Sequence, residues 1–114
     1  MDYYDKNGYA FCYIGDNDEI YSWDGKHIGF KNDQEVYLID GTWVGFSLNN
    51  YIFDENGYVV LYNDKAVNAP TPNVPTFKSI PEIPSIHGIP EIAPVHPIAS
   101  YSWSSKSPLN LFKQ

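Results

Sequence analysis

The fold is decided by a repeated motif that reads YSWDGKHIGF over residues 21–30 and VYLIDGTWVGF over residues 36–46. At the centre of each copy an aspartate precedes a glycine, as Asp24-Gly25 and Asp40-Gly41. Asp-Gly or Asn-Gly between apolar runs is the strongest short-range signal for a β-hairpin, because both residues tolerate the positive φ of a type I′ turn. Each copy is therefore predicted to form one hairpin with a two-residue turn.

The motif recurs on both sides of this stretch. Asn7-Gly8 and Asn56-Gly57 extend the series, and the spacing between successive pairs is nearly constant. With two-residue turns, three columns of large apolar side chains share one face of the hairpins, which we expect to be the core. These columns are Tyr4, Tyr21, Tyr37 and Phe53, then Phe11, Ile28, Val44 and Val60, and then Tyr13, Phe30, Phe46 and Tyr62. The opposite face carries Tyr3, Ile20, Val36 and Ile52, set against Cys12, Gly29, Gly45 and Leu61.

Four hairpins favour a closed arrangement. A single hairpin is marginally stable in water, whereas four that share a core can close on themselves and leave few open edges. We therefore predict an all-β fold in which residues 1–64 form a closed, pseudo-fourfold arrangement of four β-hairpins. Residues 65–114 form a second unit, a proline-rich extended tail, because all nine prolines lie at or after Pro70 and proline donates no hydrogen bond to a sheet.

The tail has a period of three. Every third residue from Val74 to Tyr101 is apolar or aromatic, and the next register is rich in proline. A polyproline II helix has three residues per turn, so the tail is predicted to be a PPII-like rod with an apolar edge and a proline-rich edge. A solvated linker is the alternative. The regular apolar edge favours docking instead, on the chain's own hairpin ring or on equivalent tails of other copies.

Composition excludes some partners. The chain has 114 residues, a net charge of −7 and no arginine, so it lacks the clustered basic side chains of a nucleic-acid or anionic-membrane surface. We expect neither a signal peptide at residues 1–18 nor a membrane-spanning segment, and a single cysteine, Cys12, fits reducing conditions. These observations predict a cytoplasmic protein.

The whole pattern resembles a known family. The runs over residues 21–30 and 36–46, the proline-rich triplets and the closing Ser102-Trp103-Ser104 are similar to the small bacterial 4-fold beta flower proteins. Two features depart from that family: isoleucine stands where Leu-Arg-Pro triplets are expected, and Tyr9-Ala10 weakens the first repeat. The resemblance implies a fold and no established activity.

Aromatic side chains are the best binding candidates, because exposed rings on hairpins can stack on sugars or grip a peptide. The candidates are Trp23, His27, Trp43 and Trp103. Trp43 and His27 share a column that faces away from the predicted core, which places them at the surface if only one face is buried. In the alternative, Trp43 covers the second face or receives the tail.

Catalytic and metal-binding patterns are weak. Asp16, Asp18 and Glu19 form an acidic loop, which is either a solvated loop or the carboxylate pair of a small hydrolase. The histidines lack partners at ligand spacing, so we predict no catalytic residue, no metal and no cofactor. Cys12 is expected to be a small buried residue rather than a nucleophile.

Three functions follow as hypotheses. The first is a non-catalytic protein-interaction or self-assembly module whose partner is another copy of the chain, as a homo-oligomer through the tail, or another protein. The second is a glycan- or ligand-binding module built from aromatic hairpins. The third is a small hydrolase that uses the acidic loop.

Overall fold

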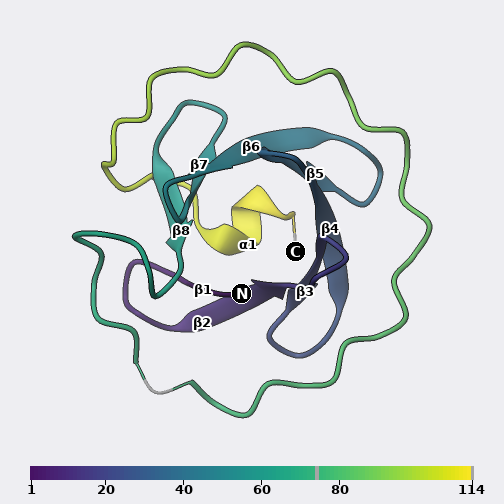
Figure 1. Ribbon diagram of the computed structural model, residues 1–114, viewed down its shortest axis with the longest axis horizontal. Coiled ribbons are helices and arrows are strands. Elements are labelled where there is room, and N and C mark those ends of the chain that lie inside the picture. The colour runs from purple at the N-terminus through teal and green to yellow at the C-terminus, as the bar shows by residue number, and fades with distance from the viewer. Residues whose placement is uncertain (74, 114) are drawn as a thin grey trace.

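The structure, a computed structural model, describes residues 1–73 and 75–113. This part of the chain contains eight β-strands and one short helix. They are β1 (Asp2–Tyr4), β2 (Ala10–Ile14), β3 (Glu19–Ser22), β4 (His27–Asn32), β5 (Glu35–Leu38), β6 (Trp43–Leu48), β7 (Tyr51–Asp54), β8 (Val59–Tyr62) and α1 (Pro108–Leu111). Each strand pairs antiparallel with the next, and β1 pairs with β8, so the sheet closes into a barrel (Figure 1). The predicted all-β, closed arrangement of four hairpins is confirmed.

The hairpin turns differ from the prediction. Only the glycine of each Asn-Gly or Asp-Gly pair has a positive φ, between 84° and 92°. The glycine amide donates to a carbonyl three positions earlier, as Gly8 does to Asp5 at 2.9 Å. These are three-residue loops in which glycine forms a β-bulge, so the predicted two-residue type I′ turn is wrong. In the first turn the Asp5 carboxylate accepts from the amides of Asn7 and Tyr9, which stabilises this longer loop.

The bulge changes which residues share a face. Tyr21 pairs with His27 instead of Ile28, and the same shift occurs in every hairpin. The barrel interior therefore combines the face expected to lie opposite the core with the column of Ile28 and Val60, which was expected to share a face with the aromatic columns. Its buried members include Tyr3, Cys12, Ile20, Ile28, Val36, Ile52, Val60 and Leu61. Leu111 and Phe112 close the barrel at α1, where Phe112 stacks on Phe11 at 6.0 Å between ring centroids.

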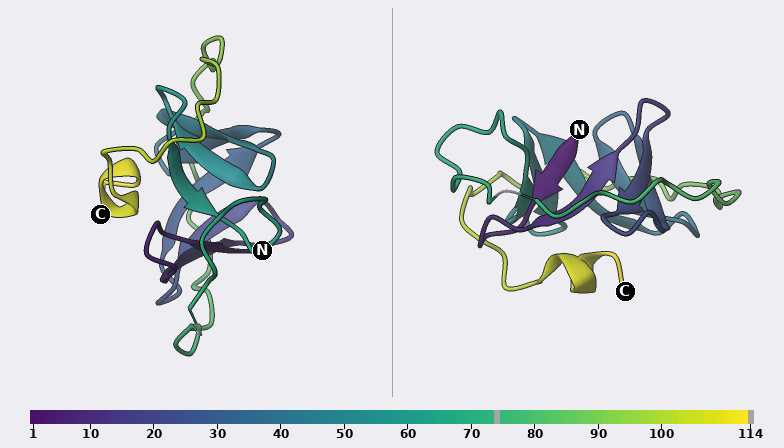
Figure 2. Two further views of the ribbon diagram at one scale, coloured as in Figure 1. Left: turned by 90° about the vertical axis from the view of Figure 1, so that its left-hand side faces the viewer. Right: turned by 90° about the horizontal axis from the view of Figure 1, so that it is seen from below.

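The aromatic columns face outward and are covered by the tail. We call residues 70–73 and 75–101 the belt, because they run around the outside of the barrel and enclose it on nearly all sides (Figure 1). The molecule is a flat disc of 35 × 34 × 22 Å. The belt lies around its perimeter, and α1 lies on one of its flat sides (Figure 2). None of its described residues belongs to a helix or strand. The aromatic columns are thus a second core, between barrel and belt.

The belt is attached at every hairpin turn by the same backbone hydrogen bond. The carbonyl of each turn glycine accepts a bond from a belt amide, and successive belt donors are nine residues apart. The pairs are Asn73 to Gly8, Glu82 to Gly25, Glu91 to Gly41 and Ser100 to Gly57, at 2.8 to 2.9 Å. One nine-residue repeat of the belt therefore matches one hairpin of the barrel.

Glycine is required at these attachment points for two reasons. The positive φ is one of them. The other is space, because a Cβ added at Gly41 would overlap the Ile89 carbonyl and one added at Gly25 would overlap the Ile80 carbonyl. The glycines of the Asp-Gly and Asn-Gly pairs, which predicted the hairpins, are thus also the residues that the belt contacts.

Candidate functional site

Three basic side chains of the belt lie over aromatic rings of the barrel, and each also faces a carboxylate. They are Lys78 over Tyr13 with Asp2, His87 over Phe30 with Glu19, and His96 over Phe46 with Glu35. The Lys78 ammonium is 4.6 Å from its ring centroid, and the two histidine rings stack at 3.8 and 4.2 Å. We call these residues the belt bases. They are again nine residues apart, and they fill the outer face of the first three hairpins.

The two acids of the belt also face the barrel. A carboxylate oxygen of Glu82 accepts from the His27 amide at 2.7 Å, and one of Glu91 accepts from the Trp43 amide at 2.7 Å. The Tyr37 hydroxyl donates to the Glu91 carbonyl at 3.0 Å. Burial raises the pKa of Tyr37, and the nearby Glu35 and Glu91 carboxylates add to this rise. These polar groups hold the belt in place and leave its outer edge to apolar side chains.

The outer edge of the belt is a ring of exposed apolar side chains. Its members are Phe77, Ile80, Ile83, Ile86, Ile89, Ile92, Val95 and Ile98, which we call the rim, and they are 88% to 99% exposed. The tail lies on the chain's own hairpins, but the apolar edge does not make the contact, so the expectation that this edge docks there is wrong. The next register, which holds the belt bases, faces the barrel because its side chains match the carboxylates and rings there. Val74, the first position of the predicted apolar edge, lies outside the described residues.

A pocket of about 500 Å³ lies where the belt begins and ends, and we call it the seam pocket. It is lined by Asn49, Asn50, Tyr51, Val67, Asn68 and Tyr101. The Tyr51 hydroxyl donates to the Val67 carbonyl, and Asn49 Nδ2 donates to the Tyr101 hydroxyl at 2.7 Å. The walls are thus aromatic and aliphatic, and the mouth carries amide groups. None of the described residues that line the pocket is charged.

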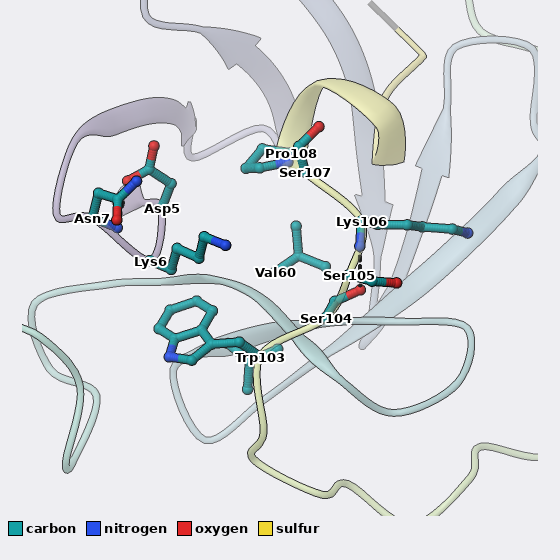
Figure 3. A pocket seen from close by; sticks show the side chains of 11 residues that line it. Asp5, Lys6, Asn7, Val60, Trp103, Ser104, Ser105, Lys106, Ser107 and Pro108 are labelled. Atoms are coloured by element: carbon teal, nitrogen blue, oxygen red, sulfur yellow. Dashed lines mark hydrogen bonds between the residues drawn. The ribbon is translucent and has the colours of Figure 1, made fainter.

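A smaller pocket of about 170 Å³ lies between the first hairpin turn, β8 and the segment that leads into α1 (Figure 3). Lys6, Val60 and Trp103 line it, while the Lys106 side chain extends away and its ammonium lies 3.1 Å from a Glu55 carboxylate oxygen. The Trp103 ring is 38% exposed and packs edge-on against Tyr62. The pocket thus offers an amine and an exposed ring to a ligand, and its wall also contains the side chains of Asp5, Asn7 and three serines.

The other binding candidates from the sequence lie under the belt. The His27 side chain is fully buried, with Nε2 2.8 Å from a Glu19 oxygen, so the expected surface position is wrong. Trp23 and Trp43 are half-buried, and their indole nitrogens donate to the Thr76 carbonyl and the Glu35 carboxylate. Trp43 therefore receives the tail, as in the alternative derived from the sequence. Trp23 and His27 belong to the hairpin of β3 and β4, Trp43 begins β6, and Trp103 lies in the segment before α1, so the four candidates do not form one site.

The acidic loop does not bring its carboxylates together. Asp16 and Asp18 are exposed, and Asp18 faces Lys31 at 3.8 Å. Glu19 is engaged by His27 and His87. Each acid of the loop thus has a different environment, and Glu19 contacts His87 of the belt. The hydrolase hypothesis stays a prediction.

Cys12 is fully buried inside the barrel, and this burial raises the pKa of its thiol well above the usual range. The predicted role as a small buried residue is confirmed. Within residues 1–73 and 75–113, no group of three metal-ligating side chains gathers at one point. No helix in this part of the chain is long and apolar enough to cross a membrane.

The repeats of the belt were missed in the sequence, although a signal is present. Residues 80–88 read IPEIPSIHG and residues 89–97 read IPEIAPVHP, so a nine-residue unit with Ile-Pro-Glu and a histidine occurs twice. The period of three concealed it, since nine is three turns of that pattern. Recognition of this unit would have predicted the pairing of one belt repeat with each hairpin.

These features define a class: a closed ring of four β-hairpins with Asp-Gly or Asn-Gly turns, enclosed by its own C-terminal segment. The family model of the 4-fold beta flower protein matches residues 1–112, and the chain belongs to this family. Comparisons with curated proteins and with solved structures gave no significant match.

Proposed function

We propose that this protein is a non-catalytic interaction and self-assembly module, which presents the rim to a neighbouring copy or to another protein. The observation that supports this function is the exposure of eight large apolar side chains at every third position of a segment that is itself fastened to the barrel. Burial of one isoleucine is worth about 1.5–3 kcal/mol. A belt that served only to cover the barrel would gain from turning these side chains inward.

The chemistry of the two belt edges supports the same conclusion. The inward register uses bases and prolines, and its contacts with the barrel are hydrogen bonds, ion pairs and ring stacking. The rim side chains take no part in these contacts. Contiguous exposed apolar surface on a protein is typical of an interaction site.

We further propose that the belt adopts the polyproline II conformation. The belt from Asn73 to Ser100 follows three hairpin-to-hairpin intervals. A polyproline II segment of this length, at about 3.1 Å per residue, spans roughly 84 Å. This span matches three quarters of the circumference of a disc 35 Å across. A polyproline II signature in circular dichroism that is lost on heating is the expected result.

A cytoplasmic location is also proposed. Its support is a single cysteine that is buried as a thiol, a state that persists in reducing compartments.

The test of the proposed function compares the native chain with a rim variant in which the eight rim residues are replaced by glutamine. Because these side chains are exposed, the variant is expected to fold with unchanged stability. Light scattering combined with small-angle scattering should show assembly of the native chain and a monomer for the variant. Leu109→Gln, at an exposed position on α1, is the matched control. Equal assembly of all three proteins would contradict the proposal.

Trp103 supports a second candidate function, the glycan-binding module. It is a half-exposed ring beside a pocket, a combination that suits stacking on a sugar. Affinity chromatography on polysaccharides, with Trp103→Ala as the comparison, tests it. Retention that survives Trp103→Ala would place glycan binding elsewhere.

A further inference from the structure

The fourfold pattern is broken at one place, the fourth hairpin. The first three hairpins have a carboxylate in the first strand and a belt base above the second strand. At the corresponding positions of the fourth hairpin, Tyr51 stands where Asp2, Glu19 and Glu35 stand in the others. The belt begins and ends here, beside β7 and β8 (Figure 1). The rim is interrupted at this point, and the seam pocket opens in the gap.

We propose that the seam pocket is a receptor for the belt of a second copy, which inserts a rim isoleucine against the two tyrosine rings. This inference rests on the proposed function and names its partner. It assigns one defined surface to each side of the contact.

The composition of the seam pocket fits an extended proline-rich segment. Such segments are bound in grooves lined by aromatic rings, where tyrosine faces contact proline and neighbouring side chains bond the free backbone carbonyls. Tyr51 and Tyr101 supply the rings, and Asn49, Asn50 and Asn68 supply amide donors. At about 500 Å³ the pocket has ample room for an isoleucine side chain.

Backbone conformation holds this lining in position. Tyr101 has a φ of 59°, which is rare for a bulky residue. An outlier of this kind persists where the surrounding structure fixes it, and such outliers concentrate at binding sites. Asn49 and Asn50, with φ of 53° and 71°, form the two-residue turn between β6 and β7, in which positive φ is the ordinary conformation.

Charge permits a second copy to bind at the seam pocket. The chain carries a net charge of −7, so most of its surface repels another copy. The described lining of the seam pocket is uncharged, and the two belt acids, Glu82 and Glu91, are bonded to the barrel. Rim and pocket can therefore meet without placing like charges together.

The chain's own belt cannot fill the pocket. It is fixed to the hairpins from Asn73 to Ser100 by backbone hydrogen bonds at all four turn glycines, and its last residue, Tyr101, is part of the pocket wall. When the contact between a rim on one copy and a pocket on the next is not returned, it is heterologous and produces rings or open chains of subunits. When two copies exchange the contact reciprocally, it produces a two-fold dimer.

A mixing experiment with two monomeric variants tests this arrangement. The rim variant described above keeps the pocket, and Val67→Trp fills the pocket but keeps the rim. Val67 is 74% exposed, so the substitution leaves the core intact, and Val67→Glu serves as a second pocket variant. Sedimentation equilibrium should show assembly of the native chain, and self-association at least tenfold weaker for each variant. A mixture of the rim variant with either Val67 variant should form a pair of twice the 13.0 kDa chain mass and nothing larger.

Other outcomes separate the inference from the function on which it rests. If the Val67 variants assemble like the native chain while the rim variant stays monomeric, the seam inference is overturned and the rim function stands. Assembly of the rim variant like the native chain overturns both. A native chain that remains monomeric up to about 1 mM, where even a contact of about 4 kcal/mol is detectable, overturns the seam inference.

Discussion

In the barrel, the repeated unit is a hairpin held by antiparallel pairing with both neighbouring strands. In the belt, a much shorter repeat is held by a few backbone hydrogen bonds at each hairpin turn. The barrel buries its aliphatic side chains inside. The belt exposes its aliphatic side chains and uses bases, acids and prolines for its internal contacts. Both follow the same fourfold plan.

The difference teaches that the two repeats have separate physical roles. Strand pairing and interior burial determine that the chain folds, and the belt covers the outer aromatic columns and determines what surface is offered. Substitutions in the barrel should therefore change global stability. Substitutions in the belt should act locally or not at all.

The largest effect is expected inside the barrel. Ile20 is fully buried, so Ile20→Ala should lower the free energy of unfolding by about 2–5 kcal/mol, through lost burial and the cavity left behind. Urea denaturation measures this change. A loss below about 1 kcal/mol would show that the barrel interior is loosely packed, and that the contrast with the belt is weaker than described.

The next effect is expected where barrel and belt meet. Alanine at Gly41, Gly25, Gly57 and Gly8 imposes the same positive-φ strain, of about 1–2 kcal/mol, at each position. The added Cβ is expected to push the belt away most at Gly41, where it overlaps the Ile89 carbonyl, and least at Gly8, where the nearest atom is 3.0 Å away. Destabilisation should follow the order in which the four glycines are named.

Amide hydrogen exchange shows whether this effect is local. In Gly41→Ala, the amide of Glu91 should lose protection while amides of the barrel ladder keep theirs. Equal loss of protection in β5 and β6 would mean that barrel and belt unfold as one unit.

A smaller effect is expected at a belt base. Lys78→Met keeps the aliphatic stem but removes the charge that lies over Tyr13 and faces Asp2 at 2.9 Å. The expected loss is about 0.5–1 kcal/mol, because both interactions lie at the surface. Lys26→Met, at an exposed turn position, is the matched control. If salt does not reduce the difference between the two variants, the charge has no part in holding the belt.

The smallest effect is expected on the rim. Ile86 is 99% exposed, and Ile86→Ala should leave the free energy of unfolding within about 0.5 kcal/mol of the native value. Measured at a concentration where the native chain is monomeric, it is the counterpart of Ile20→Ala. A loss comparable to that of Ile20→Ala would place this side chain in a core and contradict the exposed rim.

The sequence predicted the four hairpins, the closed ring and the apolar period of the tail, because turn residues and side-chain periodicity are local signals. It did not predict which side chains of each hairpin point into the barrel, or which edge of the belt points outward. A bulge at Gly25 moves the partner of Tyr21 by one position, and in a strand such a shift reverses the face. The direction of Ile80 and its equivalents depended on contacts of Lys78 and His87 with distant carboxylates, which no local pattern reveals. The seam pocket combines Tyr51 of β7 with Tyr101 at the end of the belt, and it has no sequence signature.

The separation of the two repeats along the chain has an evolutionary consequence. A tandem duplication copies one contiguous stretch, so it can add a hairpin or add one repeat of belt, but not both. A fifth hairpin without its belt unit would leave one set of outer aromatic rings uncovered. An extra belt unit without its hairpin would have no turn glycine to accept its backbone hydrogen bond. The number of hairpins is therefore fixed at four, unless two insertions in different halves of the gene occur together.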